Sequence, residues 1–213
     1  SENARYAQAS MLNELNRFFS KPDKPLILAL SRPDKRKNIS GLIQAFGEDL
    51  ELQTMANLAI FAGLRKDIDT MEENEREVLT RMLLLMDKYD LYGKMAIPKK
   101  HDFEYEVPAL YRIAAEKGGV FINPALTEPF GLTLLEAAAC GLPLVATENG
   151  GPVDIISNCR NGILVDPLDA DAIAQALLET FSHEPALLLE ASVDLTPIRK
   201  LWLVWRKRSR MRQ

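Results

Sequence analysis

The sequence predicts an α/β protein with a single Rossmann-like domain, in which about six parallel strands are flanked by helices. Short apolar runs rich in Leu, Ile and Val alternate about six times with stretches of helical periodicity, which is typical of a parallel sheet wrapped by helices. The apolar runs show little alternation with polar residues, and this indicates strands buried on both faces. The chain has 213 residues, of which 47% are hydrophobic, and this length can bury one good core.

The N-terminal part predicts a helix, a strand and a second helix. Residues 3–19 carry apolar side chains at helical spacing, namely Tyr6, Ala9, Leu12, Leu15 and Phe19. Residues 25–31 form an apolar run without alternation and predict the first buried strand. The basic segment 32–38 follows this strand and precedes a helical stretch at 39–46.

Two further strand–helix pairs are predicted in the middle of the chain. Apolar residues at 58–62 predict the second strand, and a polar loop at 63–69 follows it. Residues 75–89 predict a helix because apolar side chains share one of its faces, namely Val78, Met82, Leu85 and Met86. Residues 94–97 predict a short third strand, and residues 107–117 predict the next helix.

The remaining strands and helices continue the same order. The apolar runs 119–123 and 144–147 predict the fourth and fifth strands. Residues 132–140 lie between them and predict a helix, because they are strong helix formers and Gly141 suits a helix end. The last elements are expected to be a short helix at 153–157, a strand at 163–165 and a helix at 169–181.

The chain is expected to divide into three parts. Residues 1–23 would form an N-terminal helix and linker, and residues 24–183 would form the Rossmann-like domain. Residues 184–213 are basic, and two interpretations of them stay open: a partial closing helix of the domain, or a tail of unrelated sequence. No domain boundary or repeat is visible before about residue 183.

Composition argues against several classes of function. A net charge of −4 disfavours nucleic acid as a partner. No apolar run approaches the roughly 20 residues that span a bilayer, and the N-terminus lacks a charged-then-apolar signal segment. Cys140 and Cys159 have neither metal-binding nor redox spacing, so we expect reduced thiols in a cytoplasmic protein without membrane contact.

Acidic pairs at short spacing raise the alternative of a divalent metal site. Asp67 and Asp69 form an Asp-x-Asp, but they lie in a polar loop without a further carboxylate at fixed spacing. Asp169 and Asp171 are typical of residues at a helix start. We therefore expect no metal ion and no cofactor.

The segment 124–140 carries the main functional signal, because it joins a strand to a helix through a loop. The first amides of a helix lack intrahelical acceptors, and the helix dipole adds positive charge there. The amides of Gly131, Leu132 and Thr133 are therefore expected to bind a phosphate or pyrophosphate, and Gly131 allows close approach of the ligand.

Two carboxylates flank this anion site. Glu128 precedes the predicted helix and Glu136 lies one turn inside it. Carboxylates repel phosphate but accept hydrogen bonds from sugar hydroxyls, so the pair suits a ligand with a diol on each side of a pyrophosphate, namely a nucleotide sugar. The alternative is that these glutamates only complement the helix dipole.

A cationic loop forms the second part of the predicted site. Arg32 to Asn38 reads Arg-Pro-Asp-Lys-Arg-Lys-Asn and lies after the first strand, where open parallel sheets bind their ligands. Arginine and lysine there are well placed for a diphosphate. The alternative is a solvated basic loop, which is the commoner role of a charge run.

The string Glu-Pro-Phe-Gly-Leu-Thr-Leu-Leu-Glu-Ala at 128–137 resembles the donor-site motif of retaining glycosyltransferases of the two-Rossmann-domain (GT-B) type. More narrowly, FINPALTEPFGLTLLEAAACGLPLVATENGGPVDII at 121–156 resembles the sucrose-phosphate synthase family, and next the sucrose synthases. The spacing of Arg32 and Lys37 also resembles the Arg-x4-Lys-Asn element of these enzymes. The resemblance covers nearly all of residues 24–182 and implies the C-terminal, donor-binding half of a GT-B fold.

The resemblance implies a role for each matching residue. Arg32 and Lys37 would bind the donor pyrophosphate, together with the amides of Leu132 and Thr133. Glu128, with the amides of Phe130 and Gly131, would hold the glucose hydroxyls, and Glu136 would hold the ribose diol. The nucleobase would lie near Lys100 and His101. The three residues expected to be catalytic are Arg32, Lys37 and Glu128.

The implied reaction moves glucose from UDP-glucose to fructose 6-phosphate with retention, giving sucrose 6-phosphate. In the family the N-terminal domain supplies the acceptor site, so the chain by itself is expected to be inactive. Sucrose synthase, another Glu-x7-Glu transferase half, and a non-catalytic nucleotide-sugar-binding module stay open as alternatives. A homodimer through an exposed apolar surface also stays open.

Overall fold

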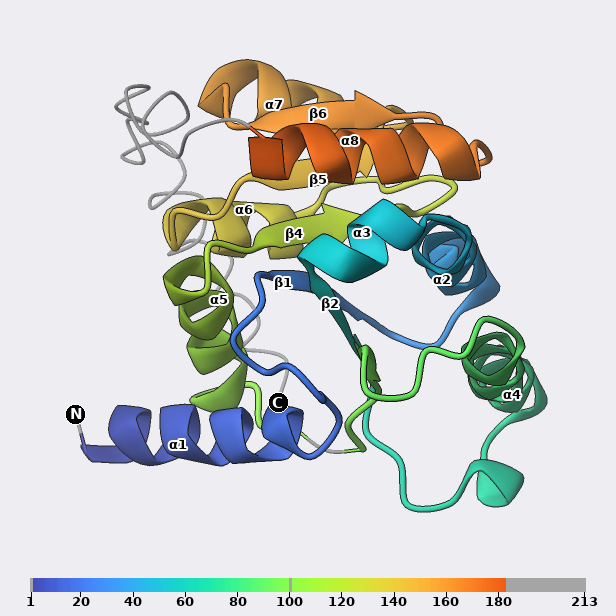
Figure 1. The fold of residues 1–213 in the computed structure, drawn as a ribbon. Coiled ribbons are helices and arrows are strands. Elements are labelled where there is room, and N and C mark those ends of the chain that lie inside the picture. Colours follow the sequence, from blue (N-terminus) through green and yellow to red (C-terminus); the bar gives the residue numbers. More distant parts are fainter. Residues whose placement is uncertain (1, 100, 183–213) are drawn as a thin grey trace, which may run out of the picture.

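The computed structural model of the protein describes residues 2–99 and 101–182, and these form a three-layer α/β/α structure (Figure 1). Lys100 and the basic segment 184–213 lie outside the described residues, so the predictions for them are not addressed by the structure. The middle layer is one parallel sheet of six strands in the order β3-β2-β1-β4-β5-β6. The strands are β1 Leu26–Ser31, β2 Asn57–Ala62, β3 Met95–Ala96, β4 Val120–Asn123, β5 Leu144–Thr147 and β6 Gly162–Val165.

Helices cover both faces of the sheet. The helices are α1 Glu2–Asn16, α2 Ile39–Glu48, α3 Leu50–Met55, α4 Glu73–Lys88, α5 Glu106–Glu116, α6 Leu132–Ala139, α7 Pro152–Cys159 and α8 Ala170–Ser182, with 3-10 turns η1 Lys35–Lys37 and η2 Ile68–Thr70. One apolar core lies between the sheet and α2, α3, α4 and α8. The other core lies between the opposite face and α1, α5, α6 and α7.

The burial of strand β1 explains its uniform apolar sequence. Ile27 and Ala29 belong to one core, and Leu26 and Leu28 belong to the other. Successive side chains of a strand point to opposite faces, so a strand with a core on each side needs apolar residues throughout. The predicted fold class is therefore confirmed, with the predicted strands present.

Helix α3 is the element that the sequence reasoning missed. It has only six residues, which is too short for a helical period to stand out. Its start is nevertheless encoded locally, because the Asp49 side chain accepts a hydrogen bond from the Leu52 amide at 2.8 Å. Asp49, three residues before the apolar Leu52, was the signal in the sequence that could have predicted this helix start.

The strand order reverses between β1 and β4. From β1 the sheet continues outward through β2 and β3, and from β4 it continues in the opposite direction through β5 and β6. The loops after these two central strands therefore diverge and leave a crevice at their carboxyl ends, which is where open α/β sheets bind ligands. The predicted functional segments, 32–38 and 124–131, are these two loops.

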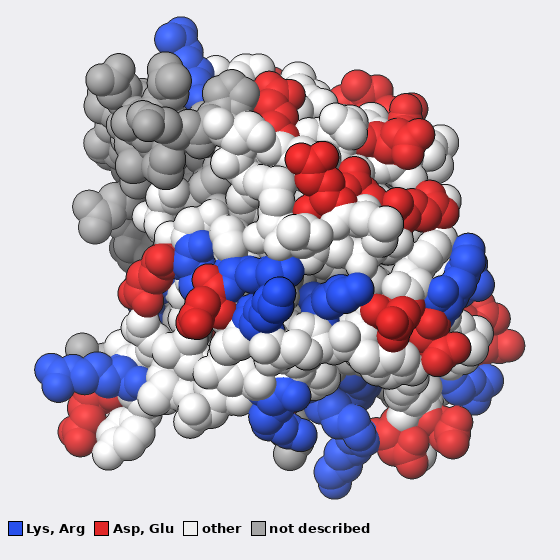
Figure 2. Space-filling view, viewed as in Figure 1, with Lys and Arg blue, Asp and Glu red and all other residues white. Residues whose placement is uncertain are grey.

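Charged side chains of both signs lie on the face shown in Figure 2. Basic side chains lie across the middle of this view, and acidic side chains lie near them on both sides.

Among the described residues, no helix is long and apolar enough to cross a membrane.

Asn38 connects the loops around the crevice. Its backbone is left-handed, with φ of 52°, at the junction of η1 and α2. Its side-chain amide donates to the carbonyl of Pro124 at 3.1 Å and to that of Pro167 at 2.6 Å. One side chain thus ties the loop after β1 to the loops after β4 and β6.

We predict that Asn38→Ala lowers the free energy of unfolding by about 1–3 kcal/mol, because two carbonyls lose their donor and alanine resists positive φ. Asn38→Gly should be less destabilising, since glycine accepts this backbone conformation. Urea unfolding measures both variants. Asn158→Ala is the control, because it removes an exposed amide donor that bonds the Asp154 carbonyl. Equal stability of Asn38→Ala and wild type would contradict the role given to Asn38.

Candidate functional site

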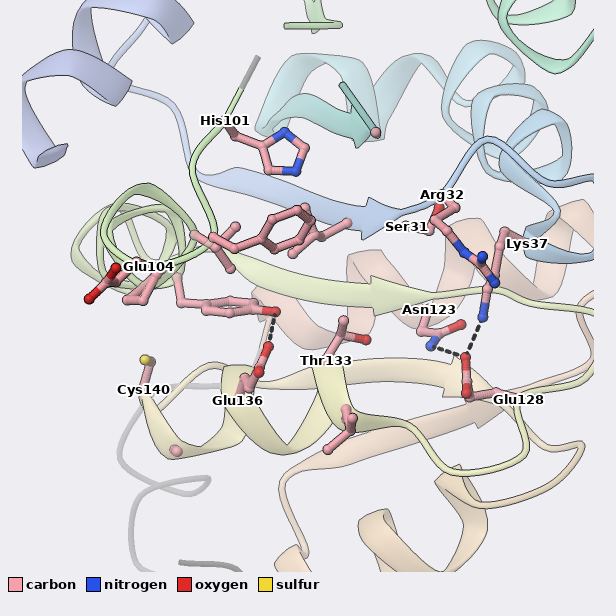
Figure 3. A pocket seen from close by; sticks show the side chains of 18 residues that line it. Ser31, Arg32, Lys37, His101, Glu104, Asn123, Glu128, Thr133, Glu136 and Cys140 are labelled. Carbon is pink, nitrogen blue, oxygen red and sulfur yellow. Dashed lines mark hydrogen bonds and ion pairs between the residues drawn. The ribbon is translucent and has the colours of Figure 1, made fainter. Parts of the chain in front are cut away.

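A cavity of about 810 Å³ opens at the carboxyl ends of β1 and β4 (Figure 3). Its walls come from the loop after β1, from α5 and the segment just before it, and from α6 along its length. Seven of the side chains predicted from the sequence line it, namely Arg32, Lys37, His101, Glu128, Leu132, Thr133 and Glu136. The tertiary structure therefore gathers segments that are distant in the sequence around one hollow.

Glu128 is the centre of a hydrogen-bond network at one end of the cavity. Its Oε2 accepts from Lys37 Nζ at 2.7 Å and from Asn123 Nδ2 at 3.2 Å. Its Oε1 accepts from the amide of Gly131 at 3.2 Å and, more weakly, from that of Phe130 at 3.4 Å. Both carboxylate oxygens are thus engaged, and the cationic loop is held against the loop before α6.

This network sets the charge of Glu128. Burial raises the pKa of its carboxyl, but the hydrogen bonds from Lys37 and Asn123 outweigh burial, and the pKa is lowered overall. The side chain is therefore an ionised acceptor at neutral pH. A ligand hydroxyl that binds Glu128 would share the carboxylate with these donors.

The amides at the start of α6 were expected to bind a phosphate, and one of them has a different partner. The Gly131 amide donates to Glu128, so in this structure it is not directed at an anion. The Phe130 side chain is 50% exposed and does not line the cavity. Leu132 and Thr133 occupy the first helical positions, where amides have no intrahelical acceptor, and both residues line the cavity.

The cations of the basic loop differ in whether they face the cavity. Arg36 forms an ion pair with Asp34 at 2.6 Å, and Lys35 pairs with Glu77 on α4. Arg32 and Lys37 instead line the cavity, and Figure 3 shows their side chains beside each other above Glu128. Of the four cations of this loop, two thus line the cavity and two are paired with carboxylates that do not line it.

Glu136 lies in the part of the cavity toward α5. It projects from α6 and is half-buried. Tyr111 on α5 donates its hydroxyl to Glu136 Oε2 at 3.1 Å. Burial raises the pKa of the Glu136 carboxyl, while the bond from Tyr111 acts in the opposite direction. Glu136 therefore faces the hollow, as expected, rather than the apolar interior.

Sequence reasoning missed Asn123 and Tyr111. Asn123 ends β4 and is buried, and its Oδ1 also accepts from the Ala125 amide at 3.2 Å. A polar residue at the end of an otherwise apolar strand was the signal for Asn123. Tyr111 lies in a helix that packs into a core, and its only signal was a polar group within an apolar stripe.

His101 lies at the wall of the cavity near β2. It is 4% exposed and packs edge-on against Phe61 and Phe103. Its Nδ1 has no hydrogen-bond partner among the described residues. Burial lowers its pKa, so the imidazole is neutral at neutral pH.

The described residues contain no cluster of three or more His, Cys, Asp or Glu side chains that could hold a metal ion. Asp67 instead caps η2, where its side chain accepts from the Asp69 amide at 3.1 Å. Cys140 and Cys159 are free thiols, and burial raises the pKa of both.

A glycine turn fixes the backbone of Glu128. The Glu128 amide donates to the Asn149 carbonyl at 3.0 Å, and the Gly151 amide donates to the Glu128 carbonyl at 2.9 Å. Gly150 between them has φ of 112°, and a Cβ there would lie 2.3 Å from the Glu128 carbonyl oxygen. This turn therefore does more than reverse the chain, because it positions Glu128.

We predict that Gly150→Ala lowers the free energy of unfolding by about 2–4 kcal/mol, because the methyl group meets backbone and the positive φ is strained. Gly118→Ala is the matched control: its φ is also positive, at 62°, but a Cβ there meets nothing within 4 Å. Chemical unfolding measures both. Equal losses in the two variants would show that the close approach to Glu128 is unimportant.

The Glu128 network also predicts a pH dependence of stability. A carboxyl with a lowered folded-state pKa stabilises the fold above its unfolded-state value near 4.5, and this contribution is lost as the pH falls through the folded-state pKa. Glu128→Gln should therefore be less stable than wild type at pH 7, and the difference should shrink below about pH 4.5. Urea unfolding at pH 7, 5 and 4 tests this. A difference that stays constant would argue against the ion pair.

The chain is similar in sequence to known glycosyltransferases over most of its length. Residues 13–192 match the family described as glycosyl transferases group 1. Probable sucrose-phosphate synthase 3 of Arabidopsis thaliana is 57% identical over 178 residues, which are 84% of this chain and 17% of that protein. The sucrose-phosphate synthase of Zea mays is 60% identical over 166 residues, which are 78% of this chain and 15% of that protein. The chain thus spans less than a fifth of these relatives.

Solved structures agree with these relatives. A sucrose-phosphate synthase from Thermosynechococcus elongatus superposes with a TM-score of 0.64 and 27% identity, over 94% of this chain and 48% of that one. An α,α-trehalose-phosphate synthase from Burkholderia xenovorans gives a TM-score of 0.73 at 15% identity, over 98% of this chain and 48% of that one, and shows the shared fold. The predicted relation to GT-B enzymes and sucrose-phosphate synthases is confirmed, and the chain belongs to the glycosyl transferases group 1 family.

Proposed function

We propose that this chain is the donor-binding part of a sucrose-phosphate synthase, which moves glucose from UDP-glucose to fructose 6-phosphate and gives sucrose 6-phosphate. The observation that carries the proposal is the contact between Lys37 and Glu128 across the start of α6, because it forms a cation–carboxylate pair beside free helix amides. The names of the 57–60% identical relatives support the choice of substrates.

The cavity would bind the donor in a defined direction. The diphosphate would lie between Arg32, Lys37 and the amides of Leu132 and Thr133. Glucose hydroxyls would donate to Glu128. The ribose and base would extend toward Glu136 and toward His101, with Lys100 proposed beside the base. The diphosphate and glucose would thus lie at the end of the cavity that holds Arg32 and Lys37, and the ribose and base would lie at the end that holds Glu136 and His101.

The same groups would act on the transition state. Cleavage of the anomeric bond leaves negative charge on the diphosphate, and fixed cations and amides stabilise that charge as it develops. Lys37 is held by Glu128 at 2.7 Å, so its ammonium group would act from a fixed position. No side chain in the cavity is proposed as a covalent nucleophile.

Transfer is proposed to require a second domain. The chain covers 48% of the Thermosynechococcus elongatus enzyme, and the acceptor site would come from sequence outside that match. A cytoplasmic location and a homodimer also stay predictions. Fructose 6-phosphate as the acceptor, rather than fructose, separates the proposal from a sucrose synthase activity.

We predict that the chain binds UDP and that Arg32→Ala and Lys37→Ala each weaken this binding about 10- to 100-fold, as expected for losing a charge-assisted hydrogen bond. Isothermal titration calorimetry measures the dissociation constants. Arg36→Ala is the control, because its guanidinium pairs with Asp34 and is turned away from the cavity. It should bind UDP like wild type.

Three results would contradict parts of the proposal. Failure of the wild-type chain to bind UDP would remove the donor site. Equal effects of Arg36→Ala and Arg32→Ala would mean that only the overall charge of the loop matters. Sucrose 6-phosphate formation by this chain alone from UDP-glucose and fructose 6-phosphate would refute the need for a second domain.

A further inference from the structure

Tyr111 is a buried residue whose hydroxyl reaches the cavity. It is 2% exposed, and its ring packs edge-on against Phe121 with centroids 5.5 Å apart. The rest of the ring lies in the core between the sheet and α5 and α6. Phenylalanine would satisfy this packing equally well, so the packing leaves the hydroxyl group unexplained.

The hydroxyl donates to a carboxylate that also lines the cavity. Tyr111 bonds Glu136 Oε2 at 3.1 Å, across the contact between α5 and α6. Burial raises the pKa of Tyr111 far above neutral, so the phenol remains a donor at neutral pH. A buried hydroxyl needs a hydrogen-bond partner, and here that partner is a group directed at the ligand space.

The two glutamates of the cavity are held in different ways. Glu128 is paired with the cation of Lys37, whereas Glu136 forms no ion pair with any described residue. A neutral donor orients a carboxylate without cancelling its charge. Glu136 therefore presents a carboxylate without a paired cation, which can accept from ligand hydroxyls through Oε1 and repels a diphosphate at this end of the cavity.

We propose that Tyr111 is a positioning residue that fixes the Glu136 carboxylate as the acceptor for an intact ribose diol. The inference rests on the proposed function and deepens it, since it adds the residue that holds Glu136 in place for the ribose. With Oε2 held by the phenol, Oε1 is directed for the hydroxyls of the diol. A carboxylate ordered in advance avoids losing side-chain freedom when the ligand binds.

The test compares UDP with 2′,3′-dideoxy-UDP, which lacks the diol, by calorimetry on the 213-residue chain. Tyr111→Phe should weaken UDP binding roughly five- to tenfold, as expected for one hydrogen bond, and should leave binding of the dideoxy nucleotide unchanged. In a Glu136→Gln background, Tyr111→Phe should have a much smaller effect, because the two residues act together.

Tyr89→Phe is the matched control. It removes another hydroxyl that bonds a glutamate, from Tyr89 to Glu48 at 2.8 Å, and neither residue lines the cavity. UDP binding should be unchanged in this variant. Circular dichroism and thermal unfolding establish that each variant is folded. The Glu136→Gln single variant should also weaken binding of UDP but not of 2′,3′-dideoxy-UDP, which tests Glu136 independently of Tyr111.

The outcomes separate the inference from the proposed function. If wild type binds UDP but Tyr111→Phe weakens both nucleotides equally, or neither, the positioning role is wrong and the donor site stands. If wild type does not bind UDP, the proposed function is wrong and the inference is overturned with it.

Discussion

The ion pair between Lys37 and Glu128 is the interaction on which the site depends. It joins two loops that are 91 residues apart in the chain, one after β1 and one after β4, where the strand order reverses. The opposing charge of Glu128 holds the cationic loop near the start of α6, together with the hydrogen bonds that Asn38 makes to the loop after β4. Without Lys37, the carboxylate would be left half-buried with only neutral donors. Each loop is therefore held in part by the charge of the other.

Hydrogen bonds to the backbone of both loops support this ion pair. Asn38 ties the loop after β1 to two other loops, and the glycine turn at 149–151 holds the backbone of Glu128 from the opposite side. Gly131 begins α6 with φ of 90°, which bends the chain sharply into the helix. Side chains on loops reach catalytic precision only when such contacts restrict the loops.

The charged groups of the cavity are distributed unevenly along it. Its cationic end holds Arg32 and Lys37, and its opposite end holds Glu136 with a phenol as its donor. A neutral His101 lies against two aromatic rings in the same cavity. Such a distribution favours an anionic group beside Arg32 and Lys37 and hydroxyl groups beside Glu136, so it sets the direction in which the proposed ligand would lie.

Local patterns in the sequence were enough to predict the fold class, the strands and the loops that meet at the site, because burial on two faces and helix periodicity are visible over a few residues. The resemblance of two motifs to those of glycosyltransferases marked Arg32, Lys37, Glu128 and Glu136, for which the residue patterns alone left other interpretations open. Contacts in the folded chain determine which cations of the loop face the cavity: Asp34 in the same loop pairs with Arg36, and Glu77 on the distant helix α4 pairs with Lys35. Asn123 and Tyr111 gain their roles by donating to Glu128 and to Glu136, respectively. These roles became visible only in the folded chain, because a sequence pattern does not encode which side chains meet across a loop or between two helices.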